Sequence, residues 1–189
     1  MPALEHLFIA SVPPELQRNR RLQLAIRHFL MSRTRLKTFY IHHITIDPEF
    51  VFAQPGKELK YGWVCSSLDI MSFKFVITTE SEQDQAILLG SVYRQLGCLP
   101  RLRVLSIECQ IPQDSHTQEI LQLKKAADLK KLTLIGFGNA LTLQGIVAVM
   151  EAAPGLETLE LKPPLSYSDR NAVSQWLKKA GRLDVELLN

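Results

Sequence analysis

The sequence predicts an α/β fold in which one parallel sheet is built from repeated strand–helix units. Three segments share the pattern Leu-x-x-Leu-x-Leu/Ile, and they begin at Leu102, Leu129 and Leu156. These starts lie 27 residues apart each time (129 − 102 and 156 − 129). Segments with helical periodicity lie between the patterns. Self-similarity at a fixed period of this size indicates a repeat architecture with one strand and one helix in each unit.

The same six-residue pattern extends along the chain with less regular spacing. Its predicted starts are residues 4, 36, 65, 102, 129, 156 and 183, with steps of 32, 29, 37, 27, 27 and 27. Successive side chains of a strand face opposite ways, so the fourth and sixth positions of each pattern should point together into the core. We therefore predict that six residues are buried in consecutive parallel strands of one sheet: Leu105, Ile107, Leu132, Leu134, Leu159 and Leu161.

Helices are predicted between the strands. Apolar residues recur every three or four positions, for example at Leu88, Leu89, Val92 and Leu96, which predicts an amphipathic helix. Helix stop signals follow two of the predicted helices, at Pro154-Gly155 and at Gly181. The expected helix starts are Pro13-Pro14-Glu15, Ser81, Ser115, Thr142 and Ser168.

Two stretches exceed a minimal unit. Residues 47–62 contain Pro48, Pro55 and Gly56 and are predicted to form a loop with one helical turn. Residues Met71 to Thr79 are β-branched and aromatic, so they either prolong the third strand or form an edge ribbon. This second stretch would account for the step of 37 residues.

The order strand, helix, strand requires parallel strands joined by right-handed crossovers. Units of 27 to 37 residues are too short for helices to alternate between the two sheet faces, so the helices should line one side. The expected architecture is a solenoid in the form of a horseshoe arc, with a concave parallel β-sheet and convex helices. It should form a single domain over residues 1–189, with about six to seven units.

These patterns, with helices between them, resemble leucine-rich repeats of the ribonuclease-inhibitor-like type. The segments Trp63–Leu68, Leu99–Ile107 and Met150–Leu159 also resemble the repeat region of fungal F-box/leucine-rich-repeat proteins. The resemblance implies a protein-binding module, the substrate-recognition repeats of an F-box-type ubiquitin-ligase adaptor. One departure concerns the position where the family places a backbone-bonding Asn or Cys: of the six residues that occupy it in this chain, only Gln110 could form a similar bond. Another is that no F-box precedes the first repeat, so we expect the chain to be part of a longer protein.

The composition of the chain is typical of a globular protein rather than of a membrane or nucleic-acid-binding one. Apolar residues make up 46% and charged residues 22% of the chain, which is typical of a globular domain, and no apolar run is long enough to span a membrane. The formal net charge of +3 is too small to indicate nucleic-acid binding. The three cysteines, Cys65, Cys98 and Cys109, lack metal-ligand spacing, so we expect buried thiols in a reducing compartment, cytoplasmic or nuclear. No metal or other cofactor is predicted.

No catalytic motif is present. The chain has no nucleophile elbow, no phosphate-binding loop and no metalloprotease helix motif, so it is not predicted to be an enzyme. A protein is the predicted partner. The alternative to the ubiquitin-ligase adaptor is a leucine-rich-repeat scaffold or regulator outside the ubiquitin system, of GTPase-regulatory or inhibitor type.

The residues that flank the core positions of each strand should face the concave surface. Their charge is ordered, with a basic middle and an acidic C-terminal end. Two interpretations stay open: an ordinary solvated sheet with cross-strand pairs of the Lys131–Glu157 kind, or a bipolar recognition surface with Phe8 and Tyr40 as aromatic anchors. The predicted protein-binding residues on this face are Tyr40, Arg103, Lys130, Lys131, Glu157 and Glu160. The flanking set as a whole is Glu5, His6, Phe8, Lys37, Thr38, Tyr40, Ser66, Ser67, Asp69, Arg103, Val104, Ser106, Lys130, Lys131, Thr133, Glu157, Thr158, Glu160, Asp184 and Val185.

Overall fold

The computed structural model describes residues 4–9, 13, 16, 19–47, 51, 63–77, 81–110, 123, 126, 128–136, 143–162, 165–182 and 184–188. Strands and helices alternate along most of this part of the chain. The strands are β1 (His6–Ile9), β2 (Thr38–Ile46), β3 (Ile70–Val76), β4 (Val104–Gln110), β5 (Lys131–Ile135), β6 (Thr158–Lys162) and β7 (Glu186–Leu188). The helices are α1 (Arg20–Ser32), α3 (Glu82–Gly97), α5 (Leu143–Ala152) and α6 (Tyr167–Lys179).

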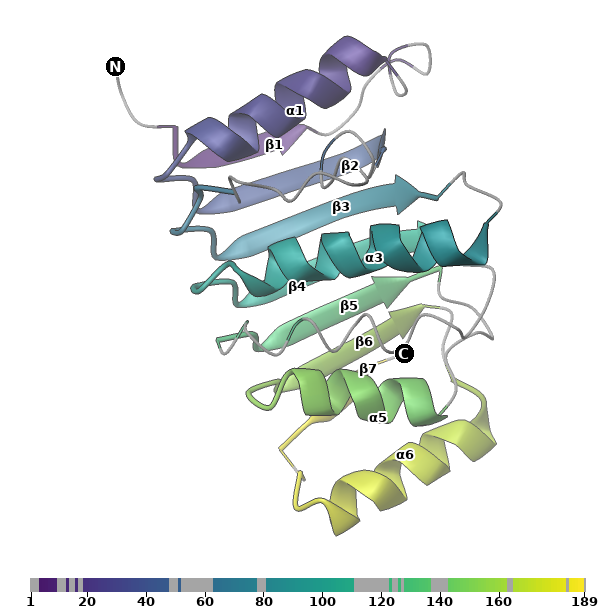
Figure 1. Ribbon diagram of the computed structural model, residues 1–189. Coiled ribbons are helices and arrows are strands. Elements are labelled where there is room, and N and C mark those ends of the chain that lie inside the picture. The colour runs from purple at the N-terminus through teal and green to yellow at the C-terminus, as the bar shows by residue number, and fades with distance from the viewer. Residues whose placement is uncertain are drawn as a thin grey trace.

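Within the described residues, all seven strands form one sheet. They lie in chain order from β1 to β7, and every neighbouring pair is parallel. Figure 1 shows α1, α3 and α5 over the same face of the sheet, with α6 beside α5. The prediction of an α/β fold with a parallel sheet is confirmed.

A shared turn leads into five of the strands. In each turn a leucine N–H donates to the carbonyl oxygen three residues earlier, and the leucine side chain is buried. This turn places the next residues of every unit in the same orientation before pairing begins. The five leucines are Leu36, Leu68, Leu102, Leu129 and Leu156.

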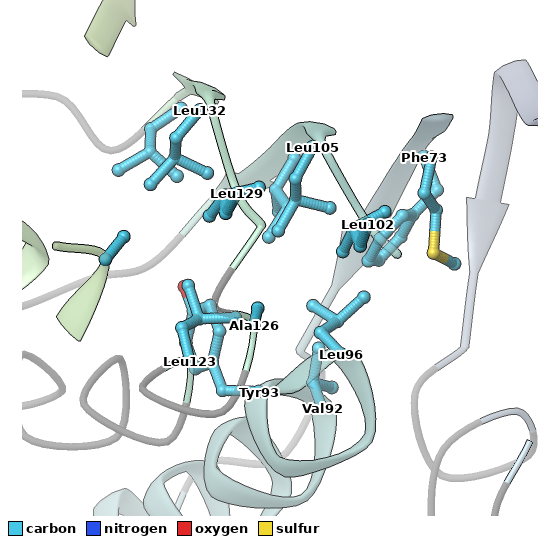
Figure 2. Packing of buried hydrophobic residues seen from close by; sticks show 14 of the residues in the cluster. Phe73, Val92, Tyr93, Leu96, Leu102, Leu105, Leu123, Ala126, Leu129 and Leu132 are labelled. Carbon is cyan, nitrogen blue, oxygen red and sulfur yellow. The ribbon is translucent and has the colours of Figure 1, made fainter. Parts of the chain in front are cut away.

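The core lies between the sheet and its helices. In Figure 2, the side chains of Leu105 and Leu132 lie on the side of the sheet that faces Val92 and Leu96 of α3. The six residues predicted to be buried at the fourth and sixth positions are all in the core and at most 5% exposed. Parallel pairing brings them into register, with Leu105 next to Leu132 and Leu132 next to Leu159.

The third unit lies three residues later than predicted. The sequence pattern placed Leu68 and Ile70 at the fourth and sixth positions, but Met71 pairs with Leu105 and Phe73 with Ile107. Met71 and Phe73 are buried, whereas Ile70 is 36% exposed. Of the two predictions for Met71–Thr79, a prolonged third strand is confirmed for residues 71–76, which belong to β3, and an edge ribbon is wrong because β3 lies inside the sheet.

The last unit also departs from the predicted spacing. A step of 27 residues would align Leu159 with Glu186, but Leu159 pairs with Leu187. Val185, predicted to face the surface, is buried, and Glu186 is exposed. Leu183, the predicted start of this unit, lies outside the described residues.

Side-chain capping explains where the helices begin. Ser81 caps α3 as predicted, accepting from the Asp84 N–H. Helix α6 begins two residues earlier than predicted: Ser166 caps it, because Asp169, three residues later, donates its N–H to the Ser166 hydroxyl oxygen at 3.2 Å. Asn19 caps α1, so that helix begins after the predicted Pro13-Pro14-Glu15.

The two predicted helix ends are also confirmed. Helix α5 ends at Ala152, just before Pro154-Gly155, and Gly181, just beyond α6, has the left-handed φ of +69° that glycine adopts at little cost. The helix starts predicted at Ser115 and Thr142 lie outside the described residues.

Candidate binding surface on the helix-free sheet face

The sheet face opposite α1, α3 and α5 is called here the helix-free face. It carries the side chains that alternate with the buried core residues of each strand. Strand pairing aligns these side chains in two rows across the sheet. One row is His6, Thr38, Ile70, Val104, Lys131, Thr158 and Glu186, and the other is Phe8, Tyr40, Ser72, Ser106, Thr133, Glu160 and Leu188.

The N-terminal end of the helix-free face is aromatic. The Phe8 ring lies 6.0 Å from the Tyr40 ring and 6.5 Å from the His6 ring, measured between centroids. His6 Nδ1 also lies 3.0 Å from the Thr38 hydroxyl oxygen. Phe8 is 65% exposed, which leaves a large apolar ring at the surface. The structure thus brings the predicted anchor Tyr40 next to Phe8.

Apolar surface continues from this aromatic end toward the centre. Ile70 of β3 is 36% exposed and pairs with Val104 of β4, which is half-buried. The predicted set for the third unit, Ser66 and Ser67 with Asp69, missed Ile70 because it followed the wrong register. The buried Met71 and Phe73, alternating with Ile70, were the sequence signal that could have revealed it.

A line of charged residues, called here the charged ladder, lies at the N-terminal ends of the strands. Each member after the first donates its backbone N–H to the carbonyl oxygen of the member before it, at 2.7–2.9 Å, so the members are neighbours across the sheet. In order across the sheet they are Glu5, Lys37, Asp69, Arg103, Lys130 and Glu157.

Ion pairs join the ladder two by two. Lys37 Nζ lies 2.7 Å from a Glu5 carboxylate oxygen, and Lys130 Nζ lies 2.7 Å from Glu157 Oε1. Arg103 binds Asp69 through two parallel N–H donors, Nε and Nη2. The signs therefore run minus, plus, minus, plus, plus, minus, and Arg103 and Lys130 are neighbours of like charge.

These pairs shift the acidities of the groups involved. The hydrogen bonds from Arg103 hold the pKa of the Asp69 carboxyl below its usual value, and the same contact raises the pKa of Arg103. The hydrogen bond from Lys37 lowers the pKa of Glu5 in the same way. All three groups therefore keep their charges at neutral pH.

Glu160 joins the charges of β5 and β6. Its carboxylate accepts from Lys162 Nζ at 2.7 Å and from the Thr133 hydroxyl at 3.1 Å, and Lys131 Nζ lies 3.4 Å away. These donors, Lys162 first, lower the pKa of Glu160. Lys131 thus pairs with Glu160 and Lys130 with Glu157, whereas the expected example was Lys131 with Glu157.

The charged residues predicted on this surface are therefore locally compensated. Arg103, Lys130 and Lys131 each have a carboxylate partner, which agrees with the solvated-sheet interpretation for these three cations. A further cross-strand pair, Lys74 with Glu108, was not predicted and lies farther along β3 and β4. The remaining asymmetry is the like-charge step between Arg103 and Lys130.

The cysteines do not belong to this surface as a group. Cys65 and Cys109 are buried, and burial raises the pKa of both thiols, that of Cys65 to about 11. Cys98 is exposed, contrary to the prediction of three buried thiols, because it ends α3 and caps it with its backbone N–H. Within the part of the chain that the structure describes, no group of three or more His, Cys, Asp or Glu residues could hold a metal ion.

None of the described helices combines the length and apolarity needed to cross a bilayer. Comparison of the chain with models of known protein families returns no match, and comparison with curated proteins returns none either. A functional proposal therefore rests on the geometry of the helix-free face and on the resemblance of the repeats.

Proposed function

We propose that this chain is a leucine-rich-repeat solenoid of the ribonuclease-inhibitor-like type that binds a protein partner on its helix-free face. The chain-ordered parallel strands, the shared turn before five of them and the helices gathered on one face support this fold. Each unit then contributes one or two side chains to a continuous surface, the arrangement by which repeat proteins build extended binding surfaces.

The observation that carries the binding proposal is the exposed aromatic end of this face. An exposed Phe8 packed against Tyr40 leaves apolar area in water that a partner could bury. Aromatic residues of this kind dominate the energetics of many protein interfaces. Beyond Ile70 and Val104, toward the C-terminal end of the sheet, this face carries polar and charged side chains, as in the rim of a typical interface.

The proposed role within the cell is substrate recognition for an F-box-type ubiquitin ligase, in the cytoplasm or nucleus. It is supported by the resemblance of the repeats to those of fungal F-box/leucine-rich-repeat proteins. The corresponding test is the half-life of a captured partner. Deleting this protein should lengthen that half-life, whereas an unchanged half-life would favour a scaffold or regulator outside the ubiquitin system.

Site-specific crosslinking tests the binding face. A photoreactive amino acid at Ser106, on the helix-free face, should crosslink to a partner in cells. The matched control is the same group at Ile87, which is 53% exposed on α3. Adducts formed from Ile87 and not from Ser106 would place the binding surface on the helical side and refute the proposal.

A further inference from the structure

The like-charge step in the charged ladder indicates what kind of partner the surface accepts. Elsewhere in the ladder, from Glu5 to Glu157, every neighbour has the opposite sign. At the step, Arg103 turns to Asp69 on one side and Lys130 turns to Glu157 on the other. Their strands are adjacent, about 4.8 Å apart, and among the described residues no ion pair joins one carboxylate to both cations. Asp128 also attracts Arg103 and contributes to raising its pKa.

Both cations retain donors for a further anion. The bidentate pair with Asp69 uses two of the five N–H groups of Arg103. The ammonium group of Lys130 uses one of three in its bond to Glu157. A carboxylate placed over the step would receive charge-assisted hydrogen bonds from both residues, and Lys131 adds a third positive charge beside them.

The surroundings favour a single carboxylate over a polyanion. Asp69 and Glu157 flank the step, and Glu160 lies on the adjoining strand. A nucleic acid would bring a phosphate against each of these carboxylates. One aspartate or glutamate side chain brings a single carboxylate to the two cations, so it meets less repulsion from these acids than a run of phosphates would.

The apolar end of the face lies at a defined distance from this step. From the middle of the Arg103–Lys130 step to the middle of the Phe8–Tyr40 pair there are three strand spacings across the sheet and three residues along it. At about 4.8 Å per spacing and 3.3 Å per residue, the separation is roughly 17 Å, the length of about five residues of extended chain. Ile70 and Val104 provide apolar surface on the path between them.

We propose that the helix-free face recognises an extended protein segment with an aspartate or glutamate over the Arg103–Lys130 step and a large apolar residue about five positions away, over Phe8 and Tyr40. This inference rests on the proposed function and adds the chemistry of the partner. It predicts a spacing as well as a charge. A surface that bound every acidic peptide equally would meet the charge requirement of this proposal but not its spacing requirement.

A random peptide library displayed on phage, with inserts of about twelve residues to exceed the predicted span, tests the proposal. Selection on the intact chain should enrich peptides with an acidic residue and an apolar residue about five positions apart. The double variant Arg103→Glu with Lys130→Glu should bind the selected peptide at least tenfold more weakly, as expected when charge-assisted contacts are lost. Raising the salt concentration should also weaken binding of the peptide.

The matched control is Lys162→Glu, which makes the same change of charge as the Lys130→Glu half of the double variant, at a lysine of similar side-chain exposure (52% against 48% for Lys130). It lies on β6, away from the proposed contact, and should leave the affinity within about twofold of the wild type. The milder Lys130→Gln variant covers the case in which the double variant does not fold, and it should also weaken binding. Circular dichroism checks folding of each protein.

Three results would overturn the inference. Enriched peptides without an acidic residue would reject the charge, and acidic peptides without a fixed apolar spacing would reject the geometry. Displacement of the peptide by a single-stranded oligonucleotide at equal concentration would indicate a general polyanion site. None of these results affects the crosslinking test of Ser106 against Ile87, so failure of this inference and failure of the proposed function can be distinguished.

Discussion

Replacing Met71 or Ile70 by alanine distinguishes two registers of the third strand, and with them two versions of the binding surface. Met71 is buried completely and pairs with Phe39 on one side and Leu105 on the other. Removing its side chain leaves a cavity inside the core. Ile70 is the adjacent residue in sequence but points to the opposite face and is 36% exposed.

The expected magnitudes differ clearly. Truncation of a buried methionine to alanine costs about 2–5 kcal/mol of unfolding free energy. For a chain of this size, that corresponds to a fall in Tm of about 4–20 °C, at roughly 2–4 °C per kcal/mol. Truncation of the exposed Ile70 should cost about 1 kcal/mol or less, because its side chain leaves little water-excluded volume behind.

Equilibrium unfolding in urea, followed by circular dichroism, measures both values. The midpoint should fall much further for Met71→Ala than for Ile70→Ala, with the slope unchanged in each case. An equal or larger loss for Ile70→Ala would show that Ile70 is the core residue, as the sequence pattern alone suggested. Ile70 would then leave the binding surface, and the apolar path between the charged step and the aromatic pair would be lost with it.

Three further predictions follow from the described contacts. The Asp69 carboxyl should titrate below its usual range by NMR and return to that range in Arg103→Gln. Because the folded pKa of Asp69 is lowered, the stability from this pair is present at neutral pH and is lost as the pH falls through the folded pKa. A thiol reagent should label Cys98 in the native protein and Cys65 only after unfolding, since Cys98 is exposed and Cys65 is buried with its pKa raised to about 11; equal native labelling of both would contradict this. Gly136→Ala should lower the free energy of unfolding by at least the roughly 1–2 kcal/mol that a side chain costs at left-handed φ, because Gly136 has φ +83° and an added Cβ would lie 2.8 Å from a β4 carbonyl oxygen. The urea midpoint should fall accordingly, and an unchanged midpoint would show that the turn relaxes.

The regular part of the chain could be predicted from the sequence. From Leu102 to Leu161 the pattern recurs with a constant period, so the same positions of each unit supply the core side chains. Alternation along a strand then assigns the flanking residues to the surface without reference to other strands. For this reason the sequence pattern is sufficient to place Val104, Lys131 and Glu160 on the helix-free face.

Where two patterns overlapped, the sequence left the choice open. Cys65-x-x-Leu68-x-Ile70 and Leu68-x-x-Met71-x-Phe73 both satisfy the six-residue pattern, and both alternate apolar residues with a period of two. A shift of three residues reverses which side chains face inward. Only pairing of Met71 with Leu105 in the neighbouring strand resolves it, because the register is a contact between segments distant in sequence.

The partners of the surface charges were likewise decided by tertiary structure. The sequence pattern predicted cross-strand pairs, but the choice between Glu157 and Glu160 for Lys131 depends on strand register and on side-chain reach across the sheet. The sequence alone determined the repeat, the alternation and most residues of the face. The tertiary structure decided which charges pair, including that Arg103 binds Asp69 and Lys130 binds Glu157, because partners in a parallel sheet are separated by a whole strand–helix unit of sequence.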